Sequence, residues 1–180
     1  MVDKAERKLI LYRNGHPILS FPVRLGYSGV IEKRYQGDGA TPEGRYRVIK
    51  KRDRGHTRFY RAFLLDYPNE DDRKRFKTAR ASGVIPVSSK IGGEIEIHGE
   101  NDVPLSLTLG CVMLENAQID ALFPYIEVGT PVSIVGALGM NNTVAQTLSG
   151  IERMANASGN QSAEALELEE QADELDSEHS

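Results

Sequence analysis

The sequence predicts a mainly-β domain with one or two short helices. Many short strand-like runs lie between turns that contain Gly or Pro, whereas only residues 69–81 and 116–123 have helix-compatible patterns. The chain has 180 residues, of which 39% are apolar, and this length can bury a core without disulfides or metals. No repeat at solenoid or propeller spacing is visible, so a single β domain is expected.

The first part of the chain predicts a β-hairpin followed by a long loop. Residues 8–12 and 18–25 flank Asn14-Gly15, a pair suited to the positive φ angles of a tight turn. Pro22 removes one donor from the strand ladder, which favours an edge strand or a bulge. Residues 26–44 then form a Gly-rich loop, and two strand-like runs follow at 45–50 and 59–67.

The second part predicts short strands around two helices. A charged helix is expected over residues 69–81, beginning near Asn69. Residues 94–98 alternate like a half-exposed strand, and another extended run covers 108–114. Asn116 is placed to cap a helix that ends at Phe123, and Gly129-Thr130-Pro131 turns the chain into a last strand at 132–135.

The charge divides the chain into a domain, expected over residues 1–137, and a tail. Residues 158–180 hold eight acidic residues and no Lys or Arg, whereas residues 1–157 hold 22 basic and 18 acidic residues, a net charge of +4. The tail is poor in aromatic and β-branched residues and cannot bury enough surface to offset its ordering entropy. We therefore expect residues 138–180 to be a linker and an acidic disordered tail, with a marginal helix at 144–154 at most.

Composition excludes several classes of protein. No apolar run approaches the ~20 residues of a transmembrane helix, and residues 1–8 lack the apolar core of a secretory signal. The small basic excess has no aromatic residues interleaved with it, so nucleic acid is not an expected partner. A single cysteine excludes an internal disulfide, and the scattered histidines predict no metal site. No cofactor is expected.

Cys111 and His98 are the candidate catalytic pair. A lone cysteine is most often a small buried apolar residue, but Gly110 before it allows a sharp turn, and the helix after it could favour a thiolate. His98 closes a predicted strand thirteen positions earlier, where its imidazole can be held rigidly as a base. No acidic or amide side chain nearby in the sequence is an obvious orienting group for His98, so a backbone carbonyl is the expected partner.

Five motifs in this order resemble the L,D-transpeptidase (YkuD-like) catalytic domain over about residues 2–135. They are Asp38-Gly39-Ala40-Thr41-Pro42-Glu43-Gly44-Arg45-Tyr46, Tyr67-Pro68-Asn69 with Asp72, Ile97-His98-Gly99, Thr108-Leu109-Gly110-Cys111, and Gly129-Thr130-Pro131-Val132. The combination of Thr-x-Gly-Cys with His-Gly is specific. The resemblance implies a β-sandwich in which a cysteine thiolate attacks the amide between a diamino acid and the terminal D-Ala of a peptidoglycan stem tetrapeptide.

By the same resemblance, Cys111 is the nucleophile and His98 the base. The backbone amides of Leu109, Gly110 and Cys111 would form the oxyanion hole, where a donor is worth on the order of 3 kcal/mol. Thr108 would hold the turn by hydrogen bonding, and Gly99 would leave room for substrate. The thioester would be resolved by a second stem peptide, by a lysine of an envelope lipoprotein, or by water.

The chain differs from many members of that family near the cysteine. Met113 stands where those members have Arg, and Leu107 replaces a Trp that is usual in the branch with the Tyr-Pro-Asn segment. These differences concern substrate choice and leave the nucleophile and base in place. Two alternatives to transpeptidation therefore stay open: hydrolysis of the same class of bond, as an L,D-carboxypeptidase or a lipoprotein-releasing amidase, and a non-catalytic peptidoglycan-binding module.

Several other side chains are candidates for binding substrate. Tyr60 and Tyr67 are expected to line the cleft, with a place in the core as the alternative, and Met113 is expected beside them. Arg58 and Arg61 are candidates for contacting the carboxylates of an anionic stem peptide, with an exposed strand edge as the alternative. Since cross-linked peptidoglycan lies outside the cytoplasmic membrane, we expect a periplasmic or envelope location and a start that is truncated or misassigned.

Overall fold

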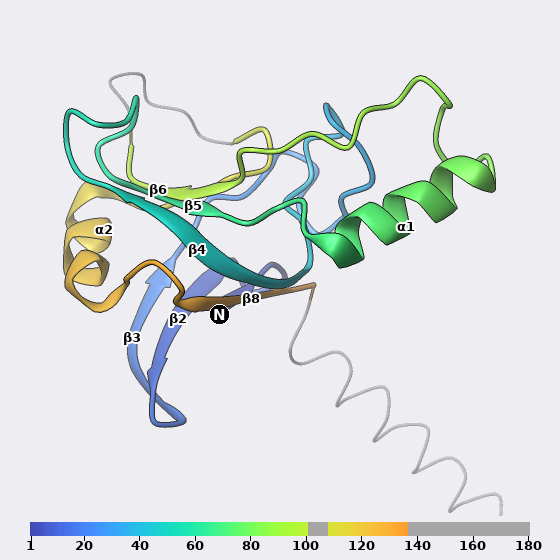
Figure 1. Cartoon of the computed structure of the whole chain (residues 1–180). Helices are drawn as coiled ribbons and strands as arrows, with labels where there is room; N and C mark the ends of the chain where they lie inside the picture. The colour runs from blue at the N-terminus through green and yellow to red at the C-terminus, as the bar shows by residue number, and fades with distance from the viewer. Residues whose placement is uncertain (101–107, 137–180) are drawn as a thin grey trace, which may run out of the picture. The chain divides into compact units, whose positions relative to one another are not determined.

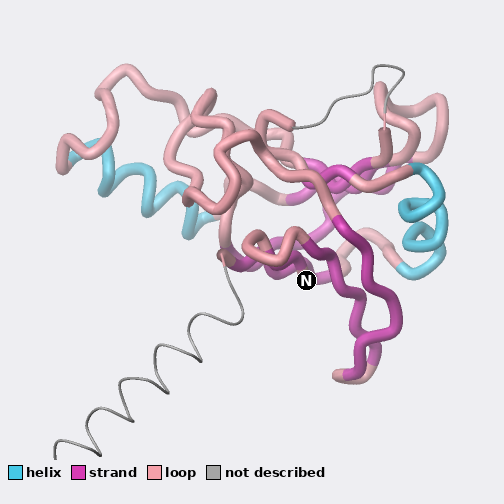
Figure 2. Tube along the Cα trace, turned by 180° about the vertical axis from the view of Figure 1, so that it is seen from behind, coloured by secondary structure: helices cyan, strands magenta, loops and turns pink. Residues whose placement is uncertain are grey.

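The computed structural model describes residues 1–100 and 108–136 and shows a mainly-β fold with short helices, as the sequence predicts. In chain order, the elements in these residues are β1 (Val2–Asp3), β2 (Lys8–Arg13), β3 (His16–Pro22), β4 (Gly44–Arg52), β5 (Ala62–Leu65), α1 (Glu70–Ala81), β6 (Glu96–His98), β7 (Val112–Met113), α2 (Asn116–Leu122), a 3₁₀ turn (Phe123–Tyr125) and β8 (Pro131–Val135). Figure 1 shows α1 and α2 at opposite ends of the strands, and the view from behind in Figure 2 agrees.

The strands follow the order β3-β2-β1-β8-β4-β5-β6-β7. The long strand β4 belongs to both halves of this arrangement, because its first residues pair with β8 and its later residues pair with β5. The register shifts between Val48 and Lys50, and such an irregularity bends a strand and increases its twist. β4 therefore joins two layers, with β6 and β7 at the far edge of the second one.

The chain after β3 crosses to that second edge. The backbone N–H of Arg24 donates to the carbonyl of Met113 at 2.9 Å, and the N–H of Met113 donates back to Arg24 at 2.8 Å. Further along, the N–H of Thr108 donates to the carbonyl of Leu25 at 3.1 Å. These bonds fix the short segment from Thr108 to Met113 between β6 and the residues that follow β3.

The core lies between the two layers and collects alternate residues of the strands with the inner face of α2. Its most deeply buried apolar side chains include Val2, Leu25, Val48, Phe63, Leu65, Val112, Ile119 and Ile134. Since Ile97 of β6 and Val112 of β7 face this core, the neighbouring residues on each strand face the other side of the sheet.

The predicted hairpin is confirmed, and several strands are shorter or longer than predicted. Asn14 and Gly15 both have positive φ, at 52° and 80°, and Pro22 ends β3, which is an edge strand. The 59–67 run contributes only β5, and β6 begins at Glu96 because Glu94 has a φ of 55°, outside the β region. β1 was not predicted, because a strand of two residues is too short to show an alternation of apolar and polar residues.

Both predicted helices are present. Asn69 caps α1 as expected: its side chain accepts from the N–H of Asp72 at 3.2 Å, and Asp72 returns a bond to the N–H of Asn69. The cap predicted for the second helix is wrong by one position, because Glu115 precedes α2 and forms a capping box with Gln118. Asn116 instead accepts from the backbone N–H of Glu100 at 2.9 Å, which ties α2 to the end of β6.

A buried lysine ties the N-terminal strand to the long loop 26–44. The ammonium group of Lys4, which is fully buried, donates to the carbonyls of Ile31 and Thr41 and to Glu43 at 2.8–2.9 Å. A buried charge is tolerated when it is paired and hydrogen-bonded in this way. In the residues that the structure describes, no helix is long and apolar enough to cross a membrane. The predicted tail, residues 138–180 with the helix at 144–154, lies outside the described residues.

Candidate active site

Strands β6 and β7 bring Cys111 and His98 to the same face of the sheet. The parallel pairing matches Ile97 with Val112 and His98 with Met113, so one residue further back Cys111 lies beside Glu96. The backbone N–H of Glu96 donates to Sγ of Cys111 at 3.4 Å, which confirms this register. Standard strand spacings then put the Cα atoms of Cys111 and His98 about 8 Å apart, on neighbouring strands with both side chains opposite the core.

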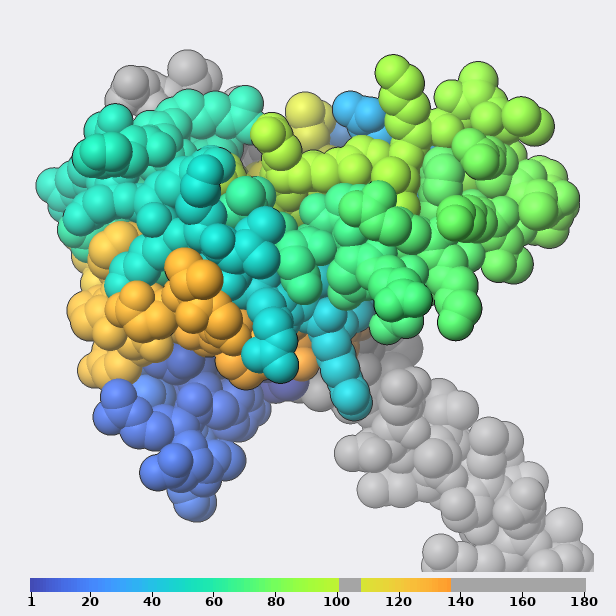
Figure 3. Space-filling view, viewed as in Figure 1, coloured from blue at the N-terminus to red at the C-terminus, as the bar shows by residue number. Residues whose placement is uncertain are grey.

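Cys111 opens into a groove of about 340 Å³. The groove is lined by Lys33, Gln36, Gly37, Gly39, Arg58, Gly92, Gly93, Glu94, Ile95, Leu109 and Cys111. In the space-filling view of Figure 3, the yellow segment that contains the cysteine turn lies at the top, between the blue loop after β3 and the lime-green segment before β6. Sγ also lies 3.7 Å from the carbonyl of Glu94, so the thiol is held at the groove wall and is not sealed in the core.

His98 is held from two sides. Its Nδ1 lies 2.6 Å from the carbonyl of Gly99, and an Nδ1–H donor there leaves Nε2 as the proton acceptor. The ring of Phe59 stacks on the imidazole with 3.6 Å between centroids, and His98 is only 3% exposed. The backbone carbonyl that the sequence could not identify as the orienting group is therefore that of the next residue.

The turn before Cys111 is organised by the Thr108 hydroxyl. Its Oγ1 accepts from the N–H of Gly110 at 3.1 Å and donates to the carbonyl of Cys111 at 2.6 Å. Because the Gly110 N–H is already bonded, the expected set of three amides is reduced to two. Within the described part of the chain, the N–H groups of Leu109 and Cys111 have no acceptor, and both residues line the groove.

Burial keeps both reactive groups neutral. Desolvation raises the pKa of the Cys111 thiol, and the bond from the Glu96 N–H offsets this only in part. Desolvation also lowers the pKa of His98 to about 4, against the opposite effect of the Gly99 carbonyl. The thiolate that we expected from the nearby helix is therefore not the resting form, because desolvation is the dominant influence. A neutral imidazole on the same sheet face as a neutral thiol can act as a general base toward it.

Comparison with known proteins identifies the family of this domain. A family model described as the YkuD L,D-transpeptidase catalytic domain matches residues 1–134. The chain belongs to the L,D-transpeptidase family. A relative from Escherichia coli K12 named "Putative L,D-transpeptidase YafK" is 30% identical over 129 residues, which cover 69% of this chain and 45% of that protein.

Two solved structures are also similar to this domain. Bdellovibrio bacteriovorus Bd1075 has 28% sequence identity and a TM-score of 0.55, with 84% of this chain and 54% of that chain covered. The helical cell shape determining protein Pgp2 from Campylobacter jejuni has 24% identity and a TM-score of 0.57, with 74% and 45% covered. The chain thus spans about half the length of these relatives, and the shared part is the L,D-transpeptidase domain.

Protonation of His98 is expected to make the stability of this L,D-transpeptidase domain depend on pH. Histidine in an unfolded chain has a pKa near 6.5, whereas burial lowers the pKa of His98 to about 4. Between these values the unfolded chain binds a proton that the folded chain does not, so the stability falls as the pH falls through this window. The fall is on the order of 3 kcal/mol. Urea unfolding of the wild type and of His98→Gln at pH 7 and pH 4.5 measures it, and equal losses in both would contradict it.

Gly110 is expected to be irreplaceable in the cysteine turn. Its φ is +138°, and an added Cβ would lie 2.8 Å from the carbonyl oxygen of Ala40. Gly110→Ala should therefore displace Cys111 and slow its acylation at least about tenfold, with a stability loss of roughly 1–3 kcal/mol. Gly83→Ala is the matched control, because Gly83 also has a positive φ (+73°) but open space around it. Acylation rates and thermal midpoints that change equally in the two variants would argue against the contact with Ala40.

The structure places four predicted substrate-binding residues away from the groove. Gly99 leaves no room for substrate, since a Cβ there would lie 2.7 Å from Asn116 and 3.0 Å from Ile119, so its role is close packing against α2. Tyr60 is on the same side: its hydroxyl donates to Asp120 of α2 at 2.8 Å. Neither residue lines the cavity beside Cys111.

Tyr67 and Met113 are buried. The Tyr67 ring packs edge-on against Tyr46 with 6.1 Å between centroids, and its hydroxyl donates to the carbonyl of Ile91 at 3.1 Å. In the Tyr-Pro-Asn segment, Tyr67 therefore packs in the core and Asn69 caps α1. Met113 is 1% exposed and pairs across strands with Arg24, so the position that holds Arg in many relatives does not face the groove here.

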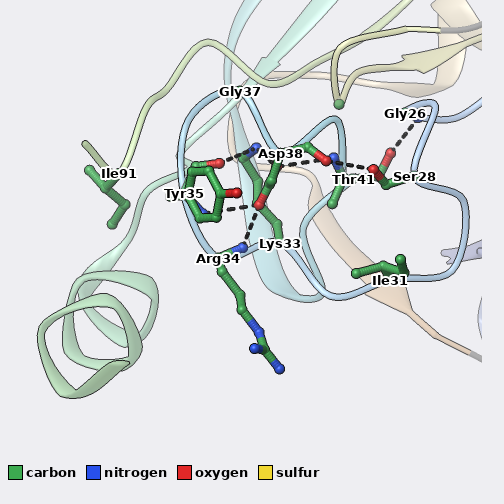
Figure 4. A network of polar contacts seen from close by, with 12 residues as sticks. Gly26, Ser28, Ile31, Lys33, Arg34, Tyr35, Gly37, Asp38, Thr41 and Ile91 are labelled. Carbon is green, nitrogen blue, oxygen red and sulfur yellow. Dashed lines mark hydrogen bonds and ion pairs between the residues drawn. The ribbon is translucent and has the colours of Figure 1, made fainter. Parts of the chain in front are cut away.

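The sequence did not single out the loop that walls the groove opposite Cys111. Figure 4 shows how the Asp38 carboxylate organises it, accepting from the Lys33 ammonium at 2.8 Å and from three backbone N–H groups, those of Arg34, Tyr35 and Ala40. Asp38 lies in the first of the five motifs that resemble the family, but nothing in the sequence of that motif indicates that its carboxylate organises the loop. In the described residues no group of three His, Cys, Asp or Glu side chains is placed to hold a metal.

Proposed function

We propose that the domain is a cysteine-dependent peptidoglycan L,D-transpeptidase that acts in the periplasm or cell envelope. The observation that carries the proposal is the position of Cys111, whose sulfur lines an open groove on the same sheet face as an imidazole oriented by the Gly99 carbonyl. Membership of the L,D-transpeptidase family supports the same chemistry.

The reaction begins with proton transfer from the Cys111 thiol to Nε2 of His98. The sulfur attacks the carbonyl carbon of the diamino acid that precedes the terminal D-Ala, and the N–H groups of Leu109 and Cys111 stabilise the oxyanion. When the C–N bond breaks, the imidazolium returns its proton to the departing amine of D-Ala. A thioester on Cys111 and free D-Ala result.

The second step releases the acyl group from the sulfur. An acceptor amine attacks the thioester and gives a proton to His98, which then reprotonates the thiolate as the new amide forms. The acceptor amine belongs to a second stem peptide or to a lysine of an envelope lipoprotein. Water in place of the amine would make the domain a hydrolase.

Incubation of the protein with a purified disaccharide-tetrapeptide tests the proposal by mass spectrometry. We expect loss of D-Ala together with a cross-linked dimer, and transient mass on the protein equal to the acyl group. D-Ala loss without dimers would assign hydrolysis in place of transfer. Intact binding to peptidoglycan sacculi without acylation by the tetrapeptide or by a carbapenem would identify a binding module and overturn the proposal.

A further inference from the structure

The charged residues that line the groove differ in whether their charge is already compensated. Lys33 forms an ion pair with Asp38, with only 5% and 11% of the two side chains exposed, and it also donates to the Tyr35 carbonyl. Its position inside the loop network is visible in Figure 4. A largely buried ammonium of this kind, with its charge paired and two of its three donors in use, supports the loop and has little capacity left for a ligand.

Arg58 lines the same groove without such a partner. In the part of the chain that the structure describes, no carboxylate lies within salt-bridge distance of its guanidinium, and the side chain is exposed. The two other arginines of the loop between β4 and β5 are paired: Arg54 contacts Asp120, and Arg61 contacts both Asp53 and Asp120. The sequence made Arg58 and Arg61 equal candidates for binding a carboxylate. In the structure, Arg61 is already paired with carboxylates of the domain, whereas Arg58 has no such partner among the described residues.

Arg58 also contacts the ring that covers His98. Its guanidinium carbon lies 4.8 Å from the centroid of the Phe59 ring, and that ring stacks on His98. The guanidinium is planar, and its donors can bind a carboxylate through two parallel hydrogen bonds. Glu94 is the acidic residue among those that line the groove, and in the described residues it forms no ion pair with Arg58.

We propose that Arg58 is the specificity residue that binds a free carboxylate of the acyl donor beside the scissile amide. This inference rests on the proposed function, since it assigns a subsite of the same groove. The donor is then a stem peptide with an ionised carboxylate within a few bonds of the carbonyl that Cys111 attacks. A donor in which that carboxylate is amidated loses the interaction.

The test compares the kinetics of D-Ala release from two donors, a disaccharide-tetrapeptide with free carboxylates and the same compound with the diamino acid's side-chain carboxylate amidated. For the wild type, the amidated donor should have a higher KM. Arg58→Gln should raise KM for the free donor about 10- to 100-fold and leave KM for the amidated donor nearly unchanged, with kcat little altered. Arg58→Lys should restore part of the difference, because it keeps the charge but not the paired donors.

A control separates this role from general charge effects. Arg34→Gln makes the same change in net charge on a side chain that points away from the loop network in Figure 4 and does not line the groove, so it should not alter KM.

The outcomes distinguish the two proposals. If wild-type protein releases D-Ala from neither donor, the proposed function fails and the subsite fails with it. If the wild type is active but Arg58→Gln raises KM equally for both donors, or lowers kcat alone, the function stands and the carboxylate subsite is overturned.

Discussion

Replacing Cys111 with serine should abolish acylation, lowering its rate at least about 10³-fold. The imidazole of His98, with its pKa near 4, is too weak a base to remove a proton from an alcohol but can assist a thiol, whose ordinary pKa is several units lower. Release of D-Ala from the tetrapeptide and the intact mass after exposure to a carbapenem both measure the loss.

The single cysteine of the chain makes the result easy to interpret. One alkyl group per molecule should be added by iodoacetamide, and its rate should still be rising with pH at pH 9 because burial raises the pKa of Cys111. Cys111→Ala removes the nucleophile altogether and should match Cys111→Ser in acylation, while both keep a thermal midpoint close to that of the wild type. A serine variant that forms the acyl-enzyme at the wild-type rate would show that the sulfur is not the nucleophile.

The elements of the fold were largely predictable because their signals are local. Asn14-Gly15 marks a tight turn through its backbone preferences, and the acidic first turn after Asn69 marks a helix start. The length of β4 and its shared place in both layers were not predictable, because the register shift after Val48 depends on pairing partners far away in the sequence. The two-residue strand β1 forms only through pairing with its neighbours and has no sequence pattern of its own.

The sequence predicted site residues whose chemical type indicates their role. It did not predict residues whose role depends on where the side chain lies in the fold. Cysteine and histidine are recognisable as reactive residue types, and the His-Gly and Thr-x-Gly-Cys motifs identify His98 and Cys111 as the candidates. Tyr60, Tyr67 and Met113 were assigned to substrate by residue type or by the family's pattern, yet Tyr60 contacts α2, and Tyr67 and Met113 are buried. Conversely, the proposed role of Arg58 depends on which of three nearby arginines has no carboxylate partner among the described residues, and this can be seen only in the structure.

The neutral resting state of the pair gives His98 a definite role. Because burial raises the pKa of Cys111 and lowers that of His98, an ion pair is not preformed, and in the proposed mechanism the proton moves when the substrate carbonyl is in place. The Gly99 carbonyl holds Nδ1, and Phe59 holds the ring plane, so that Nε2 is the nitrogen left to accept the proton.

His98→Gln should therefore lower the rate of Cys111 acylation by about 10²- to 10⁴-fold at neutral pH. In the wild type, the acid limb of the pH–rate profile should lie near the pKa of about 4 that burial gives to His98, since only the neutral imidazole accepts the proton. The variant has no such limb, and its residual rate should increase with pH up to the raised pKa of the thiol. Intact-mass kinetics with a carbapenem between pH 4 and 9 measure both profiles.

Phe59→Leu is the matched control because it keeps the imidazole and removes the ring that covers it. With more water around His98, the desolvation that lowers its pKa is reduced, so the acid limb should move toward the ordinary value near 6.5 while the rate above pH 7 changes little. An acid limb that is unchanged in His98→Gln would assign the titration to another group. In that case the imidazole beneath Phe59 would be a structural residue, and the proton of Cys111 would need a different acceptor.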